Sequence, residues 1–600
     1  MEKSSSLAKG VHWDLSDLYS GINDPMLKKD KDLINKEILK ISNTYREKFS
    51  TSTVTADEFY DAIVNYEKIW LLVNKVCDYA SLVYSIDTKS AEIGKLYQEA
   101  LELESNTSSE LMFFELGIIA IPDSEFKKLL SDKRINEYSP YLKKTRVYKP
   151  YTLTEKEEII LTKKSQTSSQ AFVRLFDQFD SSVRYELMVD GKKLSLTYSG
   201  IIPYLTSHTD RSTRKKAAEA MSKALSNEGS TYSFILNTLL ADKKTTDELR
   251  GHTSAQQATF LQYQIDPEIV DSMTNAVEKG YSLSEKFYLA KQKLMKISRL
   301  YEWDRYVLPY VTKNSSYTWE ESCEIVLRSF RSFSPTFESI AKQFIDNKWI
   351  HAEMLPTKRS GAYCSYTVPS IHPYILVNFA GEIRDVTTLA HELGHGIHGY
   401  LSRDVKFLQF WPSTSIAEIA SIFAEALIFD EIYSKETDKK VKANLLAEKI
   451  QNIFASIFRQ NAFFLFEGDI HRHRREKGEL SIDDFNNYFQ NRLQAMFGGG
   501  LQLSDGHANW WMTILHFYHY NFYVFSYAFG EMLSLSLYAK YKKEGQKMVA
   551  DYTKALTTGG TKSPKEVTMM MGIDITEPDF WNNGLKLIDG YIDEFIKLTA

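Results

Sequence analysis

Residues that interrupt helices are scarce in this chain of 600 residues. It contains 14 Pro and 27 Gly, fewer than the average usage of about 5% and 7% would give. Long stretches, such as residues 31–48 and 56–117, mix apolar and charged positions at helical spacing. Hydrophobic residues make up 43% of the chain and charged residues 25%, which is typical of a globular protein and excludes disorder as the main state. The sequence therefore predicts a mainly α-helical fold.

Two tracts depart from the helical period. Apolar and polar residues alternate over residues 183–196 around Asp190-Gly191, a pair that suits the positive φ angles of a type I′ turn, and this predicts a β-hairpin. Residues 361–381 hold two β-rich runs on either side of Pro369-Ser370. We place a domain boundary near the hairpin, which gives an N-terminal helical region over residues 1–200 and a second region over residues 201–600.

Charge and cysteine content exclude several classes of protein. The net charge is -5, so no basic surface is predicted and nucleic acid is not an expected partner. No stretch approaches the ~18 apolar residues of a membrane span, and the start of the chain has no apolar signal segment. The three cysteines, Cys77, Cys323 and Cys364, are odd in number and widely spaced, which predicts neither disulfides nor a cysteine zinc site. We expect a cytoplasmic protein without a membrane partner.

The sharpest chemical signal is the motif His391-Glu392-Leu393-Gly394-His395, which chance would give at most about 0.04 times in such a chain. Two imidazoles four residues apart on a helix share one face, about 6 Å apart along the axis, and can both bind one zinc ion. Glu392 lies about 100° around the helix and can face the attacking water. A helix through the motif is indicated by apolar residues at spacings of three and four, namely Val386, Leu389, Ala390, Leu393 and Ile397.

A catalytic zinc usually takes three protein ligands, so a third must come from elsewhere. His398 shares the stripe but lies roughly 10 Å along the axis from His391, which disfavours it. Glu418 and Glu425 are seven residues apart in an apolar helical segment that starts at Ser415, so they share a face. One could bind zinc while the other orients a ligand imidazole, and spacing alone does not order them.

A third cluster lies far downstream. His516, His519, Tyr523 and Tyr527 recur at spacings of three and four, which predicts one helix face. Peptide hydrolysis builds negative charge on the carbonyl oxygen, and a phenol or imidazole donor would stabilise it. The pattern by itself favours the alternative of an aromatic core stripe with histidines at its edge.

Several stretches together resemble the oligoendopeptidase F enzymes, zinc metallopeptidases of the family that includes thimet oligopeptidase. The likeness covers residues 13 to 530, and the combination is far more specific than the zinc motif alone. The matching stretches are WDLSDLY at 13–19, GAYCSY at 361–366, HPYILVNFAG and DVTTLAHELGHGIHGYLSR around the motif, AEIAS at 417–421, and HFYHYNFYVFSYAFG at 516–530.

The resemblance implies roles for individual residues. Glu418 is the third ligand beside His391 and His395, with one Zn²⁺ per chain, and Glu425 is a supporting or structural carboxylate. Tyr527, with His516 or His519, donates hydrogen bonds to the oxyanion. The residues expected to contact the substrate peptide are Gly361, Ala362, Tyr363, His372 and Tyr523.

The resemblance also implies an architecture: a mainly helical ellipsoid split by a deep substrate channel, with a small β-sheet beside the zinc-motif helix. The strands of residues 361–381 would offer an edge along which an extended peptide pairs. Residues 1–200 are then an N-terminal region of the oligoendopeptidase F type, and residues 201–600 the zinc metallopeptidase domain.

The resulting hypothesis is a zinc-dependent endopeptidase that hydrolyses internal bonds of short unstructured peptides, with Glu392 as general base. We expect a monomer or a weak homo-oligomer. One alternative is a metal-dependent peptide-binding protein without catalysis, which would need no base at position 392. Another is a protease of folded proteins, which would differ in access to the channel.

Overall fold

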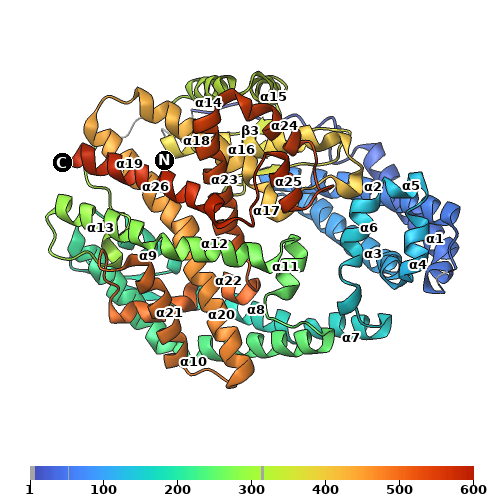
Figure 1. Cartoon of the computed structure of the whole chain (residues 1–600), viewed down its shortest axis with the longest axis horizontal. Coiled ribbons are helices and arrows are strands. Elements are labelled where there is room, and N and C mark those ends of the chain that lie inside the picture. The colour runs from blue at the N-terminus through green and yellow to red at the C-terminus, as the bar shows by residue number, and fades with distance from the viewer. Residues whose placement is uncertain (1–6, 52, 313–315) are drawn as a thin grey trace. The chain divides into compact units, whose positions relative to one another are not determined.

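The protein is mainly helical, as the sequence predicts, with a few short strands (Figure 1). This computed structural model describes residues 7–51, 53–312 and 316–600. The chain forms two compact units, each built from three segments. Unit 1 comprises Met1–Lys149, Lys313–Ser434 and Lys540–Asp574, and unit 2 comprises Pro150–Thr312, Lys435–Ala539 and Ile575–Ala600. The predicted division at residue 200 stays a prediction.

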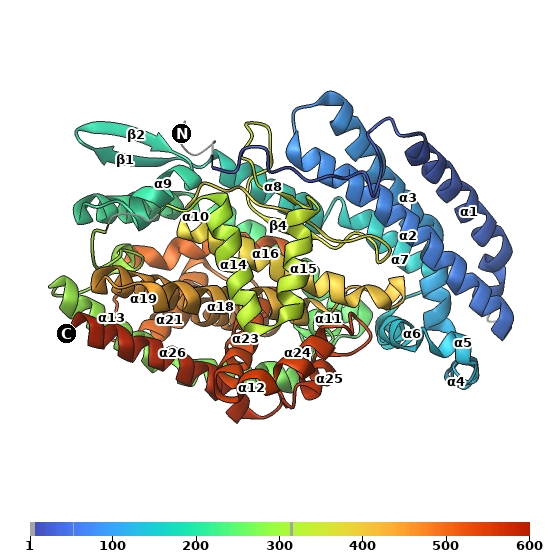
Figure 2. The same ribbon diagram turned by 90° about the horizontal axis from the view of Figure 1, so that it is seen from above.

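Unit 1 joins a layer of long N-terminal helices to the segment that carries the zinc motif. The helices α1, α2 and α3 pack on one another, and α14 and α15 lie side by side against α16 (Figure 2). Its elements are α1 (Pro25–Ser50), α2 (Ala56–Ile86), α3 (Ala91–Ala120), α4 (Asp123–Leu129), α5 (Lys133–Asn136), α6 (Ser139–Arg146), α14 (Trp319–Phe333), α15 (Pro335–Asp346), β3 (Ile350–His351), β4 (Tyr363–Ser365), β5 (Tyr374–Leu376), α16 (Ile383–Leu401), α17 (Thr414–Ala417), α18 (Ile419–Lys435), α24 (Val549–Leu556) and α25 (Pro564–Met570).

A three-stranded sheet of unit 1 has the order β3-β5-β4, with β5 in the centre. The strand β5 runs parallel to β3 and antiparallel to β4, with Cys364 opposite Ile375. The strands β4 and β5 are the two β-rich runs predicted around Pro369-Ser370, and both pack against α16. The strand β3 was not predicted, because its two residues are too short to show a period. In the described part of the chain, β4 is left at the edge of this sheet.

Unit 2 contains the predicted hairpin and the downstream aromatic cluster. Its elements are α7 (Glu155–Ser165), α8 (Ser169–Ser182), β1 (Tyr185–Val189), β2 (Lys192–Leu196), α9 (Tyr198–Thr206), α10 (Arg211–Arg250), α11 (Gln257–Tyr263), α12 (Pro267–Lys279), α13 (Tyr281–Met295), α19 (Lys439–Phe454), α20 (Gln460–Glu476), α21 (Ile482–Phe497), α22 (His516–His519), α23 (Phe525–Glu544, whose last residues belong to unit 1) and α26 (Pro578–Thr599).

The hairpin prediction is confirmed. The strands β1 and β2 are antiparallel, and Asp190 and Gly191 between them have φ angles of 49° and 76°. Of the alternating residues, Leu187 is buried and Met188 exposed, because successive side chains of a strand point to opposite faces. The buried face of β1 packs on α9 and α10, which lie beside the hairpin in Figure 2.

Candidate active site

The zinc motif lies in the middle of α16, as its apolar spacing predicts. The helix begins after Glu382, where the carboxylate of Asp385 accepts hydrogen bonds from the backbone N–H of Glu382 (3.0 Å) and Ala380 (2.8 Å), and so caps N–H groups that have no helical partner. The whole apolar stripe of Val386, Leu389, Ala390, Leu393 and Ile397 is buried. Burial of this stripe fixes the rotation of α16 and leaves the two motif histidines on another face.

The side chains of His391, His395 and Glu418 converge. Glu418 Oε2 lies 3.5 Å from His391 Nε2 and 3.4 Å from His395 Nε2, and all three donor atoms lie within 4.8 Å of one another. Zinc bonds of about 2.0–2.1 Å in a tetrahedral site place ligand atoms about 3.3–3.4 Å apart. The two imidazole nitrogens and the carboxylate oxygen therefore fit a divalent zinc ion. No other such group of three occurs among the described residues.

Two further side chains orient these candidate ligands. Glu425 Oε1 lies 2.6 Å from His391 Nδ1, so the other ring nitrogen of His391, Nε2, is the one that faces Glu418. The hydroxyl of Ser421 donates a hydrogen bond of 2.7 Å to Glu418 Oε2. A carboxylate behind a ligand imidazole fixes its tautomer and ring orientation. The contact of Ser421 was missed in the sequence, where only its position three residues after Glu418 hints at it.

Gly394 is what lets the segment with Glu418 come close to α16. A Cβ atom at position 394 would lie 2.5 Å from the carbonyl oxygen of Ala420 and 2.6 Å from the Cα of Ser421. Both atoms belong to the backbone of α18, so no side-chain rotation could make room. Glu418 itself sits at the junction of α17 and α18 rather than inside one continuous helix from Ser415, as the sequence suggested.

Burial and neighbouring charges set the protonation of these groups. Burial raises the pKa of Glu392, which is 6% exposed, and a raised pKa suits a general base. Burial lowers the pKa of His391, but the hydrogen bond and charge of Glu425 outweigh it and raise the pKa to about 9. Burial also raises the pKa of Glu418, but its interactions with His395 and His391 hold it at about 2. Glu418 is thus kept ionised, as a metal ligand must be.

The structure keeps His398 apart from the group of candidate ligands. Its side chain is 1% exposed, and burial lowers its pKa to about 3. It is therefore a neutral buried residue. Its position along the helix axis disfavours it as a ligand, and it is absent from the group of converging side chains.

The predicted substrate contacts in unit 1 fall in different surroundings. Gly361 has a φ angle of 86°, and a Cβ atom added there would meet no atom within 4 Å; it precedes Ala362 and the edge strand β4. The hydroxyl of Tyr363 donates to Ser85 Oγ at 2.8 Å. His372 is 7% exposed, stacks on Trp349 with ring centroids 3.7 Å apart, and bonds the Asp17 carboxylate at 2.9 Å. The imidazole of His372 is thus already engaged within unit 1.

The prediction of one continuous helix face for the downstream cluster is wrong. Helix α22 ends at His519 and α23 begins at Phe525. Between them the backbone takes a left-handed conformation at Phe522, with a φ angle of 57°. Spacings of three and four in the sequence cannot reveal this break, because they also arise when two short helices are joined by a turn.

The break nevertheless gathers three of the four predicted side chains in unit 2. His516 Nε2 lies 3.3 Å from the hydroxyl oxygen of Tyr527. The rings of His516 and Tyr523 stack with centroids 5.8 Å apart, and Tyr523 meets Tyr527 edge-on at 5.3 Å. His519 points elsewhere, since its Nε2 bonds Asp177 Oδ1 at 2.8 Å. The geometry thus pairs His516, and not His519, with Tyr527.

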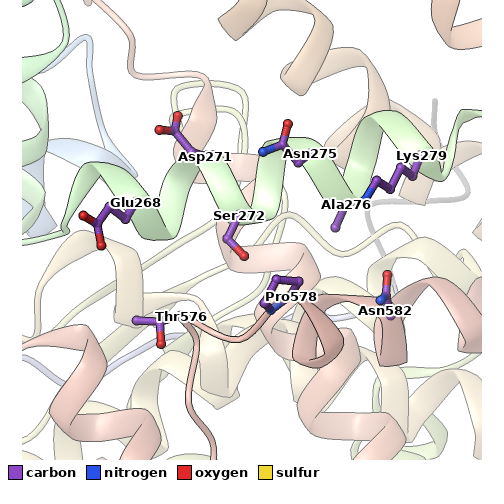
Figure 3. Close-up of a pocket in the computed structure, with 9 residues that line it drawn as sticks. All are labelled: Glu268, Asp271, Ser272, Asn275, Ala276, Lys279, Thr576, Pro578 and Asn582. Atoms are coloured by element: carbon purple, nitrogen blue, oxygen red, sulfur yellow. The ribbon is translucent and has the colours of Figure 1, made fainter.

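Unit 2 also has a surface pocket of about 490 Å³ between α12 and the start of α26 (Figure 3). Figure 3 shows Glu268 and Asp271 toward one end of the α12 wall and Lys279 at the other. None of the residues predicted from the sequence lines it. The lining residues are Glu268, Asp271, Ser272, Asn275, Ala276, Lys279, Thr576, Pro578 and Asn582.

Comparisons with known proteins agree along the whole chain. The sequence profile of Peptidase family M3 matches residues 204–587, and that of Oligopeptidase F matches residues 118–185. The chain is 26% identical over 593 residues to Oligopeptidase PepF of Bacillus subtilis, covering 98% of this chain and 87% of that protein. It is 25% identical over 597 residues to an Oligoendopeptidase F homolog of Borreliella burgdorferi, covering 98% of each.

Over residues 7–51, 53–312 and 316–600, no helix combines the length and apolar character that crossing a bilayer requires.

Solved structures share the fold. A crystal structure from Chlamydophila abortus superposes with a TM-score of 0.88 at 23% identity, covering 99% of both chains. That of oligoendopeptidase-F from Enterococcus faecium gives a TM-score of 0.72 at 19% identity, covering 95% of this chain and 98% of that one. The resemblance noted in the sequence is thereby confirmed. The chain belongs to peptidase family M3 and is a peptidase.

Proposed function

We propose that this protein is a zinc-dependent endopeptidase that cleaves internal bonds of short unstructured peptides. The observation that carries the proposal is the convergence of His391 Nε2, His395 Nε2 and Glu418 Oε2 to within 4.8 Å of one another, with Glu392 one position from the first ligand. These three residues would hold the ion, and Glu425 would orient His391 from behind.

The chemistry divides between the ion and the side chains. A zinc ion bound there would lower the pKa of a water molecule to about 7 and polarise the scissile carbonyl. Glu392 takes the proton from the attacking water and later gives it to the leaving amine. Because its pKa is raised by burial, Glu392 holds that proton between the two steps more readily than an exposed glutamate would.

The oxyanion needs hydrogen-bond donors, and we assign them to Tyr527 and His516. The resemblance to oligoendopeptidase F leaves two histidines open, and the pairing of His516 with Tyr527 at 3.3 Å favours the first. Burial lowers the pKa of His516, so its imidazole is neutral at neutral pH and can donate through one ring nitrogen. Donors of this kind act on the charge that develops in the transition state.

The peptide would bind in an extended form. The strand β4 is at the edge of its sheet, next to Gly361 and Ala362, and packs against the motif helix. An edge strand offers unpaired N–H and C=O groups to a peptide backbone without reading its side chains. We also propose Zn²⁺ as the cofactor, short peptides as the substrates and residues 201–600 as the catalytic domain. We further propose the cytoplasm as the location of the protein.

Substitution of the base tests the proposal. Glu392→Gln removes the proton acceptor but leaves the metal ligands, so we expect one zinc ion per chain and a fall in kcat of about 10²–10⁴-fold on a quenched fluorescent peptide. Metal content is measured by elemental analysis on the same sample. Cleavage at the unaltered rate by the zinc-loaded variant would remove the assigned base. Wild-type protein that binds the peptide but never cleaves it would instead show the non-catalytic alternative.

A further inference from the structure

The segment between His519 and Phe525 contains a strained residue. Phe522 has a φ angle of 57°, a conformation that is an outlier for a bulky residue other than glycine. Its side chain is fully buried, so the surrounding packing can hold this conformation. Strained backbone persists where the surrounding structure over-determines it, and such residues gather at functional sites. The neighbours of Phe522 should therefore show what holds it.

The peptide group that joins Asn521 to Phe522 is held at both ends by buried side chains. The hydroxyl of Thr259, on α11, donates a hydrogen bond of 2.9 Å to the carbonyl oxygen of Asn521. The N–H of Phe522 donates a hydrogen bond of 2.8 Å to Glu467 Oε1, on α20. Because a peptide group is planar, two helices that grip its two ends fix its orientation and the direction of the chain beyond it.

Glu467 is an unusual residue for this role. Its side chain is 1% exposed, and burial raises its pKa well above the ordinary value, which favours the neutral carboxyl. Among the described residues, Glu467 Oε2 has no hydrogen-bond partner. Burial of a polar group without full hydrogen bonding is costly. The one hydrogen bond that the structure shows for this carboxyl is the bond from the N–H of Phe522 to Oε1.

The helix that holds the backbone of Phe522 also holds its ring. The Phe522 ring lies against His471 and Phe464, both on α20, with ring centroids 4.7 Å and 5.9 Å away. Tyr523 follows at once and stacks on His516. The left-handed residue thus lies directly before Tyr523 and five residues before Tyr527, the tyrosine that the proposed mechanism uses.

We propose that Glu467 and Thr259 are positioning residues for the oxyanion donors. In this role they act through the 521–522 peptide group, which they hold from both ends and which places Tyr523 and Tyr527 relative to His516. This inference rests on the proposed function, because it requires that Tyr527 acts in the reaction. A misplacement of 1 Å can cost about 10²-fold in rate, so loss of one anchor should lower kcat more than it raises KM.

The test compares two substitutions at one position. Glu467→Leu removes the acceptor at similar size, and we expect kcat to fall at least about tenfold, KM to stay within about threefold, and amide hydrogen exchange over residues 516–527 to accelerate. Glu467→Gln keeps a neutral carbonyl acceptor and should retain kcat within about threefold and the protection of that segment. A Gln variant as impaired as the Leu variant, or a Leu variant with unaltered kcat, would overturn the proposal.

Three further variants make the result unambiguous. Asn237→Leu is a matched control, because the buried Asn237 amide likewise holds a loop backbone of unit 2, at Leu480 (2.9 and 3.0 Å), and we expect it to lose stability but keep kcat. Thr259→Val removes one hydroxyl and should lower kcat severalfold, which keeps the test valid if Glu467→Leu fails to fold. Tyr527→Phe separates a failure of the proposed donor role from a failure of the positioning role. An unaltered kcat of Tyr527→Phe would refute the donor role itself. A lowered kcat of Tyr527→Phe, together with a fully active Glu467→Leu, would refute only the positioning role.

Discussion

Substituting Gly394 by alanine should damage the proposed metal site while barely changing the stability of the fold. The added Cβ would lie 2.5 Å from the carbonyl oxygen of Ala420 and 2.6 Å from the Cα of Ser421. Ordinary contact begins at 3.4 Å, so α18 must retreat from α16 by about 0.9 Å, the difference between 3.4 and 2.5 Å. Glu418 lies two residues before Ala420 and moves with it. Metal–ligand distances tolerate only about 0.2 Å, so such a shift spoils coordination.

The expected magnitudes separate function from folding. Overpacking costs about 1–3 kcal/mol of folding free energy, and replacing a helical glycine by alanine returns about 1 kcal/mol, so the melting temperature should change by only a few degrees. A displaced Glu418 should weaken zinc binding about 10–100-fold, and kcat/KM should fall about 100-fold.

The assay combines three measurements on each purified protein. Zinc affinity is measured by competition with a chelator, kcat/KM with a quenched fluorescent peptide, and stability by thermal unfolding. Gly94→Ala is the control, since Gly94 lies in helix α3 of the same unit and its added Cβ would meet no atom within 4 Å. Zinc affinity and kcat/KM at wild-type levels in Gly394→Ala would refute the reasoning that this close approach places Glu418.

Three other predictions follow from single contacts. Glu425→Ala should weaken zinc binding about 10–100-fold, because the ligand imidazole loses its orienting carboxylate; an unaltered affinity in chelator competition would contradict this. His516→Ala should lower kcat about 10²-fold or more, while His519→Ala should lower it far less, because the His519 imidazole bonds the Asp177 carboxylate; equal losses in steady-state assays would contradict the assignment. Burial raises the pKa of Asp78 to about 7, so the unfolded chain releases this proton near pH 4 and the folded one only near pH 7, and stability falls as pH rises between them. Asp78→Asn should therefore stabilise the protein by at most about 4 kcal/mol at pH 8 and by less at pH 5, and a thermal-unfolding difference that does not vary with pH would argue against it.

Local sequence patterns were enough to predict three features: the helix α16, the β1–β2 hairpin and the approach of the two motif histidines. The apolar stripe around residue 391 predicts α16, because a helix buries every third or fourth residue, and all five predicted positions are buried. The Asp190-Gly191 pair predicts the hairpin, because few dipeptides adopt two positive φ angles. The spacing of His391 and His395 brings two imidazoles together through helix geometry alone. Each of these features depends on residues close together in the chain, at most the eleven positions from Val386 to Ile397.

The ordering of the site depends on contacts between residues far apart in the chain. Spacing left Glu418 and Glu425 equivalent, and it is the packing of α18 on α16 at Gly394 that turns the first toward the Nε2 atoms of both histidines and the second toward Nδ1 of His391.

The downstream cluster shows the same limit. Its period of three and four suggested one helix, yet the chain breaks at Phe522, where side chains from α11 and α20 hold a left-handed backbone. The partners of that peptide group lie 55 and 262 residues away in sequence. The sequence by itself determined which residues could form helices and which could act as metal ligands. The tertiary structure decided which of these residues meet, because the energy of those contacts exists only when distant segments pack together.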